Sequence, residues 1–161
     1  MKADKVEDSK RISYDKALEC LEKGECDEAM RLLRTLSAEG YVMAKETLSF
    51  LYYAGQCVEK NMNESICLDE EAAESGSTIS IFSLGITYKN KGDMSGAERW
   101  FRRGVDLRDS SSAIELAEIY ATQAKETDAI ILLDMAEQFG NLSDDEKINI
   151  AKLRTLCSKS V

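Results

Sequence analysis

Apolar residues recur along much of the chain at intervals of three and four positions, which is the pattern of helices with one buried face. The clearest case spans residues 84–104, where Leu84, Tyr88 and Phe101 supply large side chains and Gly92 separates two halves. A helical period that breaks at Gly92 predicts two helices joined by a short turn. The stretch therefore predicts a helical hairpin.

The hairpin pattern repeats at nearly constant spacing. Leu84 and Leu116 are 32 residues apart, as are Ala97 and Ala129, whereas Leu48 precedes Leu84 by 36 residues. The four extra residues fit a longer polar loop in the second hairpin. A repeat of this length is typical of stacked helical hairpins.

The repeats define a domain organisation. We expect a flexible N-terminal segment over 1–12, hairpins over about 13–40, 41–76, 77–109 and 110–140, and a capping helix with its tail over 141–161. Helical order should begin near Ser13, because the charged residues before it have little to bury. Ser143 and Glu146 form a capping box at the start of the last helix. The expected fold is all-α, a right-handed superhelical solenoid of about four antiparallel helix hairpins with a C-terminal capping helix.

Specific residues connect the repeats to a known family. The second hairpin reads A…L…Y..G..V…L…AA..G from Ala44 to Gly76, and the third keeps Gly85, Tyr88 and Phe101. The chain resembles the tetratricopeptide repeat proteins, and more particularly their Sel-one-like branch. In that family the first helices of successive hairpins line a concave surface that holds a peptide or protein segment. The resemblance implies a non-catalytic protein–protein interaction adaptor or scaffold.

A second apolar stripe on the first helices is the candidate binding groove, with polar residues at its edges. Its members are Phe50, Tyr53, Phe82, Ile86, Lys89, Asn90, Ile114 and Glu118. Such a groove suits an amphipathic helix or an extended peptide. The alternative is that these side chains are buried against neighbouring first helices or under the chain's own termini, because helices inside a solenoid are apolar over a wide arc.

Charge and hydropathy narrow the choice of partner. Thirty acidic against 21 basic residues give a formal net charge of −9, which predicts no nucleic-acid and no membrane partner. The charged N-terminus has no apolar export core, and we expect a cytoplasmic protein. Because repeat ends can associate, we expect a monomer or a weak homodimer. The acidic charge also allows an inhibitor or immunity-type protein that occludes a basic partner, with binding that weakens in salt.

The residues that usually carry chemistry are sparse. Histidine is absent, and the motifs of serine hydrolases, zinc proteases and phosphate-binding loops do not occur. The five cysteines lie at irregular gaps, which predicts free thiols and no metal site: Cys20, Cys26, Cys57, Cys67 and Cys157. We expect no cofactor, no catalytic residues and no enzyme activity. The catalytic alternative is a hydrolase related to cysteine-rich repeat proteins, which would require activity abolished by a single cysteine or carboxylate substitution.

Overall fold

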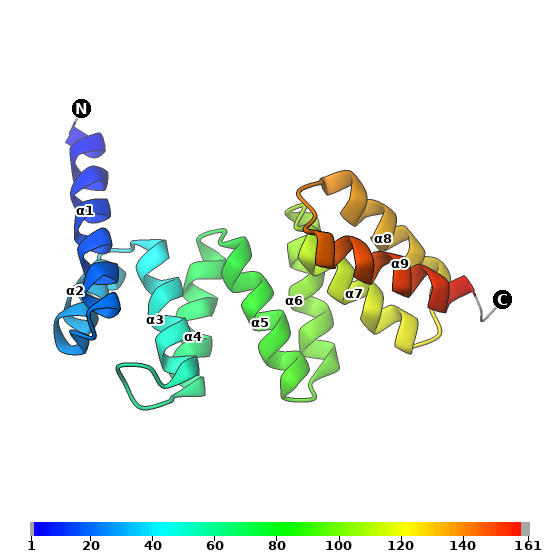
Figure 1. Cartoon of the computed structure of the whole chain (residues 1–161), viewed down its shortest axis with the longest axis horizontal. Helices are drawn as coiled ribbons and strands as arrows, with labels where there is room; N and C mark the ends of the chain where they lie inside the picture. Colours follow the sequence, from blue (N-terminus) through cyan, green and yellow to red (C-terminus); the bar gives the residue numbers. More distant parts are fainter. Residues whose placement is uncertain (1, 159–161) are drawn as a thin grey trace. The chain divides into compact units, whose positions relative to one another are not determined.

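The computed structural model describes residues 2–158, with side-chain burial from residue 6 onward. This part of the chain forms nine α-helices and no strand (Figure 1), which confirms the all-α prediction. The helices are α1 (Lys2–Glu22), α2 (Cys26–Ala38), α3 (Val42–Ala54), α4 (Met62–Glu74), α5 (Thr78–Asn90), α6 (Met94–Asp106), α7 (Ser110–Thr122), α8 (Glu126–Phe139) and α9 (Asp144–Ser158).

The chain divides into two compact units. Unit 1 is Met1–Ser80 and unit 2 is Ile81–Val161, so the boundary falls within α5. In unit 1, α1 packs against α2, α2 against α3, and α3 against α4. In unit 2, α6 packs against α7, α7 against α8, and α9 against both α7 and α8.

The core of unit 1 follows the helical stripes read from the sequence. Ala17, Leu33 and Leu48 are fully or almost fully buried and belong to one apolar cluster. The Tyr14 and Tyr41 ring centroids lie 5.5 Å apart within this cluster. This packing holds α1 against the start of α3.

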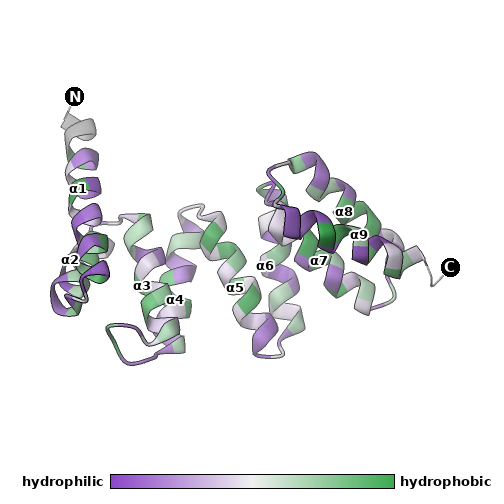
Figure 2. Cartoon of the chain, in the orientation of Figure 1, coloured by the Kyte–Doolittle hydropathy of each residue, from purple (hydrophilic) through white to green (hydrophobic). Residues whose placement is uncertain are grey.

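The N-terminal boundary of α1 differs from the prediction. The helix begins at Lys2 rather than near Ser13, although the coloured part of its N-terminal half is mostly hydrophilic (Figure 2). No glycine or proline interrupts the chain before Gly24, so nothing stops the helix from extending beyond its buried face. Lys10 Nζ donates to the Glu39 carbonyl oxygen at 2.9 Å and connects this part of α1 to the end of α2.

The loop between α3 and α4 carries a covalent link that the sequence did not predict. Cys26, at the start of α2, forms a disulfide with Cys57 in this loop, with the two Cα atoms 5.0 Å apart. The prediction of five free thiols is therefore wrong for these two, whereas Cys20, Cys67 and Cys157 are free. The reason is tertiary: the long loop of the second hairpin returns to the first hairpin and brings together residues 31 positions apart.

The core of unit 2 depends on a close contact between α5 and α6. Phe101 is fully buried, and its ring occupies the place where a side chain on Gly85 would lie, with Cε1 2.3 Å from the position of a Cβ atom. Phe82 adds a second ring, with its centroid 5.9 Å from that of Phe101. Glycine at position 85 thus allows the two helices to approach.

The last helix covers the end of unit 2 (Figure 1). It buries Ile150, Leu153 and Cys157. The predicted capping box is formed: the Ser143 backbone N–H donates to Glu146 Oε2 at 2.8 Å, and the Glu146 N–H donates to Ser143 Oγ at 3.2 Å. This reciprocal pair starts α9 where it can close the array.

Candidate functional site

The predicted groove residues belong to both units, and each unit presents its own surface. In unit 1 the surface lies on α3, on the side away from the buried Leu48 and Leu51. Met43, Phe50 and Tyr53 are 47%, 59% and 38% exposed, and their spacing of seven and three positions places them on one side of the helix. We name this surface the α3 face.

Sequence reasoning missed Met43 as a member of the α3 face. The available signal was its position seven residues before Phe50, which is two helical turns. Ala44, the next residue, is fully buried, so two neighbouring apolar residues differ completely in exposure and hydropathy alone does not mark Met43 as a surface residue. The face therefore extends two turns beyond the predicted pair of aromatic residues.

The α3–α4 loop borders the α3 face and supplies a cation. Lys60 Nζ lies 5.2 Å from the centroid of the Tyr53 ring, within the range of a cation–π contact. The loop is fixed at both sides of this lysine, because the Asn61 N–H donates to the Tyr52 carbonyl oxygen at 2.9 Å and Cys57 is bound to Cys26. A positive charge is thus held beside the exposed aromatic residues.

The groove residues of unit 2 are packed more tightly than those of unit 1. Phe82 and Ile86 are half-buried and pack against the core cluster. Ile114 is only 3% exposed and belongs to that cluster. Ile114 is therefore part of the core, whereas Phe82 and Ile86 keep part of their surface exposed, and the groove membership of these two stays a prediction.

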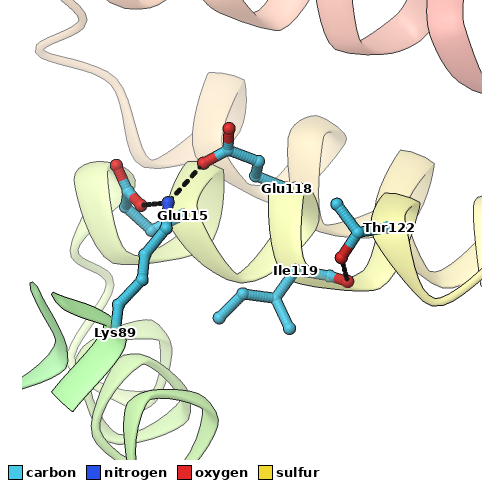
Figure 3. A network of polar contacts seen from close by, with 5 residues as sticks. All are labelled: Lys89, Glu115, Glu118, Ile119 and Thr122. Carbon is cyan, nitrogen blue, oxygen red and sulfur yellow. Dashed lines mark hydrogen bonds and ion pairs between the residues drawn. The ribbon is translucent and has the colours of Figure 1, made fainter. Parts of the chain in front are cut away.

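Lys89 lies between two carboxylates of α7 (Figure 3). Its Nζ contacts Glu115 Oε2 at 2.8 Å and Glu118 Oε2 at 2.6 Å. Burial alone would lower the pKa of Lys89, but the two hydrogen-bonded carboxylates outweigh it, and the pKa is raised. The ammonium is neutralised, and the cluster as a whole carries one excess negative charge. It is therefore suited to a basic group of a partner rather than to a carboxylate.

The two remaining polar residues of the predicted groove differ in whether they have a partner side chain. Glu118, predicted as a groove edge, is joined to Lys89, and Asn90 is exposed at the C-terminal end of α5. Glu115 was not predicted, although it lies three positions before Glu118 and so shares its side of α7. A pattern read along one helix gave no sign that a lysine of another helix would join both.

Metal ligation and thiol reactivity are the two kinds of chemistry on which the described residues give direct information. No group of three or more His, Cys, Asp or Glu residues among them could hold a metal ion. Burial raises the pKa of the Cys20 thiol and also that of Cys67, where nearby Glu71 adds to the effect. Both thiols are thereby kept in the protonated, weakly nucleophilic form at neutral pH. No helix in the described residues is long and apolar enough to cross a membrane.

Comparison with solved structures identifies the fold. A Sel1 repeat protein from Oxalobacter formigenes superposes with a TM-score of 0.67 at 22% identity, covering 80% of this chain and 56% of that protein. The protective antigen c5321 of uropathogenic Escherichia coli, which has an SLR fold, gives 0.62 at 19% identity, with coverages of 82% and 33%. TPR-like repeats of a Podosopora anserina protein described as a kinesin light chain give 0.58 at 17% identity, with coverages of 92% and 87%.

These likenesses establish that the chain has the helical repeat fold of Sel1-like and tetratricopeptide-like proteins, as its sequence predicted. The chain spans about half the length of the first of these proteins and a third of the second. No protein-family model and no curated protein matches the sequence. The fold is one commonly used for protein–protein interaction.

Proposed function

We propose that this chain is a non-catalytic adaptor or scaffold that binds a peptide or protein segment through its first helices, with the α3 face as the main contact. The observation that supports this proposal is the exposure of Phe50, Tyr53 and Met43 on one side of α3. Large exposed apolar side chains on one side of a helix favour a protein interaction site. The repeat fold itself is commonly used for such interactions.

The α3 face has the composition of a binding hot spot. Fully burying an exposed phenylalanine or methionine side chain contributes about 1.5–3 kcal/mol, and tyrosine is among the residue types enriched at the energetic centre of interfaces. Lys60 beside Tyr53 offers a partner an ammonium group at the edge of the apolar contact. An amphipathic helix with an acidic residue next to its apolar stripe would match this surface.

The proposal also covers the kind of complex. The partner is a protein or peptide rather than nucleic acid or membrane, consistent with the net charge of −9. The chain acts as a monomer or a weak homodimer. The cytoplasmic location remains a prediction, and the Cys26–Cys57 disulfide counts against it because such bonds persist mainly in oxidising compartments.

A second candidate is the inhibitor or immunity-type protein that occludes a basic partner. The observation that favours it is the excess carboxylate at the Lys89 cluster, where two glutamates face one lysine. A complex held mainly by this charge would weaken steeply in salt and would tolerate changes on α3. An apolar α3 contact would show the opposite pattern.

The test begins with affinity capture from the native cells and continues with the purified partner in direct binding measurements. Phe50→Glu places a charge on the α3 face, and Ile131→Glu is the matched control on α8, where Ile131 is 51% exposed. We expect at least tenfold weaker binding for Phe50→Glu and less than a twofold change for Ile131→Glu. Equal affinities for both variants would refute the α3 contact, and loss of binding at high salt alone would favour the inhibitor.

A further inference from the structure

An arginine–tyrosine pair occurs at equivalent positions in both units. Arg34 Nη2 of α2 donates to the Tyr52 hydroxyl of α3 at 3.3 Å, and Arg102 Nη2 of α6 donates to the Tyr120 hydroxyl of α7. Arg34 and Arg102 lie 68 positions apart, and so do Tyr52 and Tyr120. The arginine–tyrosine pair therefore occurs once in each unit at the same repeat position, and the two copies can be compared directly.

In unit 2 the pair is completed by a carboxylate. Glu98 Oε1 lies 2.7 Å from Arg102 Nη2 and accepts a hydrogen bond from the Tyr120 hydroxyl at 3.2 Å. Guanidinium, hydroxyl and carboxylate form a triangle in which each group contacts the other two. The tyrosine hydroxyl is satisfied both as acceptor and as donor.

In unit 1 the third corner of the triangle is missing. Met30 stands at the position equivalent to Glu98 and is buried in the core. Within residues 6–158 no carboxylate forms an ion pair with Arg34, and its contact with Tyr52 is the hydrogen bond that remains. The exposed guanidinium thus keeps most of its five N–H donors for another group.

A hollow of about 450 Å³ lies beside this incomplete triangle. Arg34 and Tyr52 line it together with the apolar side chains of Leu48 and Leu68. Its other charged pair is internally satisfied, because Lys45 Nζ is bonded to Glu71. The hollow therefore offers one available cation and one hydroxyl donor above the almost fully buried Leu48 and Leu68, with Glu64 as its one further carboxylate.

We propose that this hollow binds an acidic side chain of a partner protein segment, whose carboxylate takes the corner that Glu98 fills in unit 2. An aspartate or glutamate would accept from Arg34 and Tyr52, and flanking apolar residues would lie on Ala38 and the Tyr52 ring, the exposed and half-buried members of the lining. A single exposed ion pair strengthens binding by about fivefold at most, so a lone small acid would be held weakly. The added apolar contacts select a polypeptide segment as the occupant.

This site goes beyond the α3 face, because its arginine comes from α2, the second helix of its hairpin. One lining residue opposes the proposed ligand: Glu64, in the first turn of α4, places a carboxylate at the hollow. Neutralising it should strengthen binding of an acidic group. The site and the α3 face can therefore be tested, and can fail, separately.

The experiment uses the full chain labelled with ¹⁵N and two tripeptides, acetyl-Leu-Glu-Leu-amide and acetyl-Leu-Gln-Leu-amide, which differ in the carboxylate alone. Nuclear magnetic resonance follows the arginine Nε–H signals. We expect the glutamate peptide to shift the Arg34 signal saturably, and the glutamine peptide to bind three- to fivefold more weakly. The Arg102 signal should stay unchanged, because Glu98 already occupies its corner.

Three variants sharpen the test, each with its amide spectrum checked for an intact fold. Arg34→Gln should abolish the preference for the glutamate peptide, and Glu64→Gln should tighten its binding at least twofold. Glu98→Ala should open the second triangle, because it removes the side chain that fills the corner, so that the Arg102 signal now responds to the glutamate peptide. Phe50→Glu should leave all of these results unchanged, which separates this site from the α3 face.

Several results would overturn the proposal. These are an Arg34 signal that neither peptide shifts, equal affinities for the two peptides, or a glutamate preference that survives in Arg34→Gln. The proposal would also be overturned if the Glu64→Gln substitution shifted the Arg34 signal while neither peptide shifted it. That result would show that Arg34 pairs with Glu64 in solution and that the corner is already filled.

Discussion

The Cys26–Cys57 disulfide should control the stability of unit 1. It closes a loop between residues 31 positions apart, and constraining an unfolded loop of that length stabilises the folded state by about 3.5 kcal/mol at 25 °C. A unit of 80 residues has an ordinary stability of roughly 4–12 kcal/mol. Replacing both cysteines by serine should therefore remove a large fraction of that stability.

Hydrogen exchange measured by mass spectrometry can follow this loss locally. In repeat proteins each element depends mainly on its neighbours, so peptides of α2 and α3 should exchange faster while those of α8 and α9 change little. A loss of 3.5 kcal/mol corresponds to about 300-fold faster exchange at the most protected amides. Cys67→Ser, which removes an exposed free thiol, is the matched control and should leave the exchange unchanged.

Two results would refute this reasoning. Alkylation of the denatured, unreduced protein should modify three thiols, as the structure has Cys20, Cys67 and Cys157 free; modification of five would show that the bond does not form. If three are modified but the double serine variant exchanges less than threefold faster in α2 and α3, the bond forms without stabilising unit 1.

Two further predictions concern unit 2 and use urea unfolding followed by the fluorescence of the chain's single tryptophan. Gly85→Ala would place a Cβ atom 2.3 Å from the buried ring of Phe101, and should destabilise the unit by about 1–3 kcal/mol; an unchanged midpoint would show that the helices separate freely. Burial alone would raise the pKa of Glu146, but hydrogen bonds from Ser143 and Ser111 outweigh this effect, and the net result is a lowered pKa. The carboxylate therefore stabilises unit 2 above about pH 4.3, and this contribution is lost as the pH falls below that value. Glu146→Gln should destabilise by about 1 kcal/mol at pH 7 and reduce the acid sensitivity, and an equal acid sensitivity in both proteins would contradict the assignment.

The sequence predicted the repeat because each hairpin must bury the same positions. Leu48, Leu84 and Leu116 recur at the spacing of the hairpins, and all three are buried. Such contacts are made within a hairpin and with its neighbour, so their positions follow the helical period. The capping box at Ser143 was equally accessible, because its two hydrogen bonds join residues three positions apart.

The features that sequence reasoning missed depend on longer-range geometry. The disulfide requires the path of the α3–α4 loop, and the Lys89 cluster requires α5 and α7 to lie side by side at one register. Ile114 carries the same apolar signal as Phe50, yet the first is buried and the second exposed. Hydropathy alone cannot separate these two cases, because helices inside a solenoid are apolar over a wide arc.

Binding of a protein segment at the α3 face is the central claim, and hydroxyl-radical footprinting of the complex with its purified partner would test it most directly. Methionine, phenylalanine and tyrosine side chains are oxidised at rates that follow their exposure. Met94 on α6 is 44% exposed and serves as an internal reference for Met43, which is 47% exposed. We predict that oxidation of Met43, Phe50 and Tyr53 falls severalfold in the complex while that of Met94 does not. Unchanged oxidation of all three α3 residues in the saturated complex would contradict the claim.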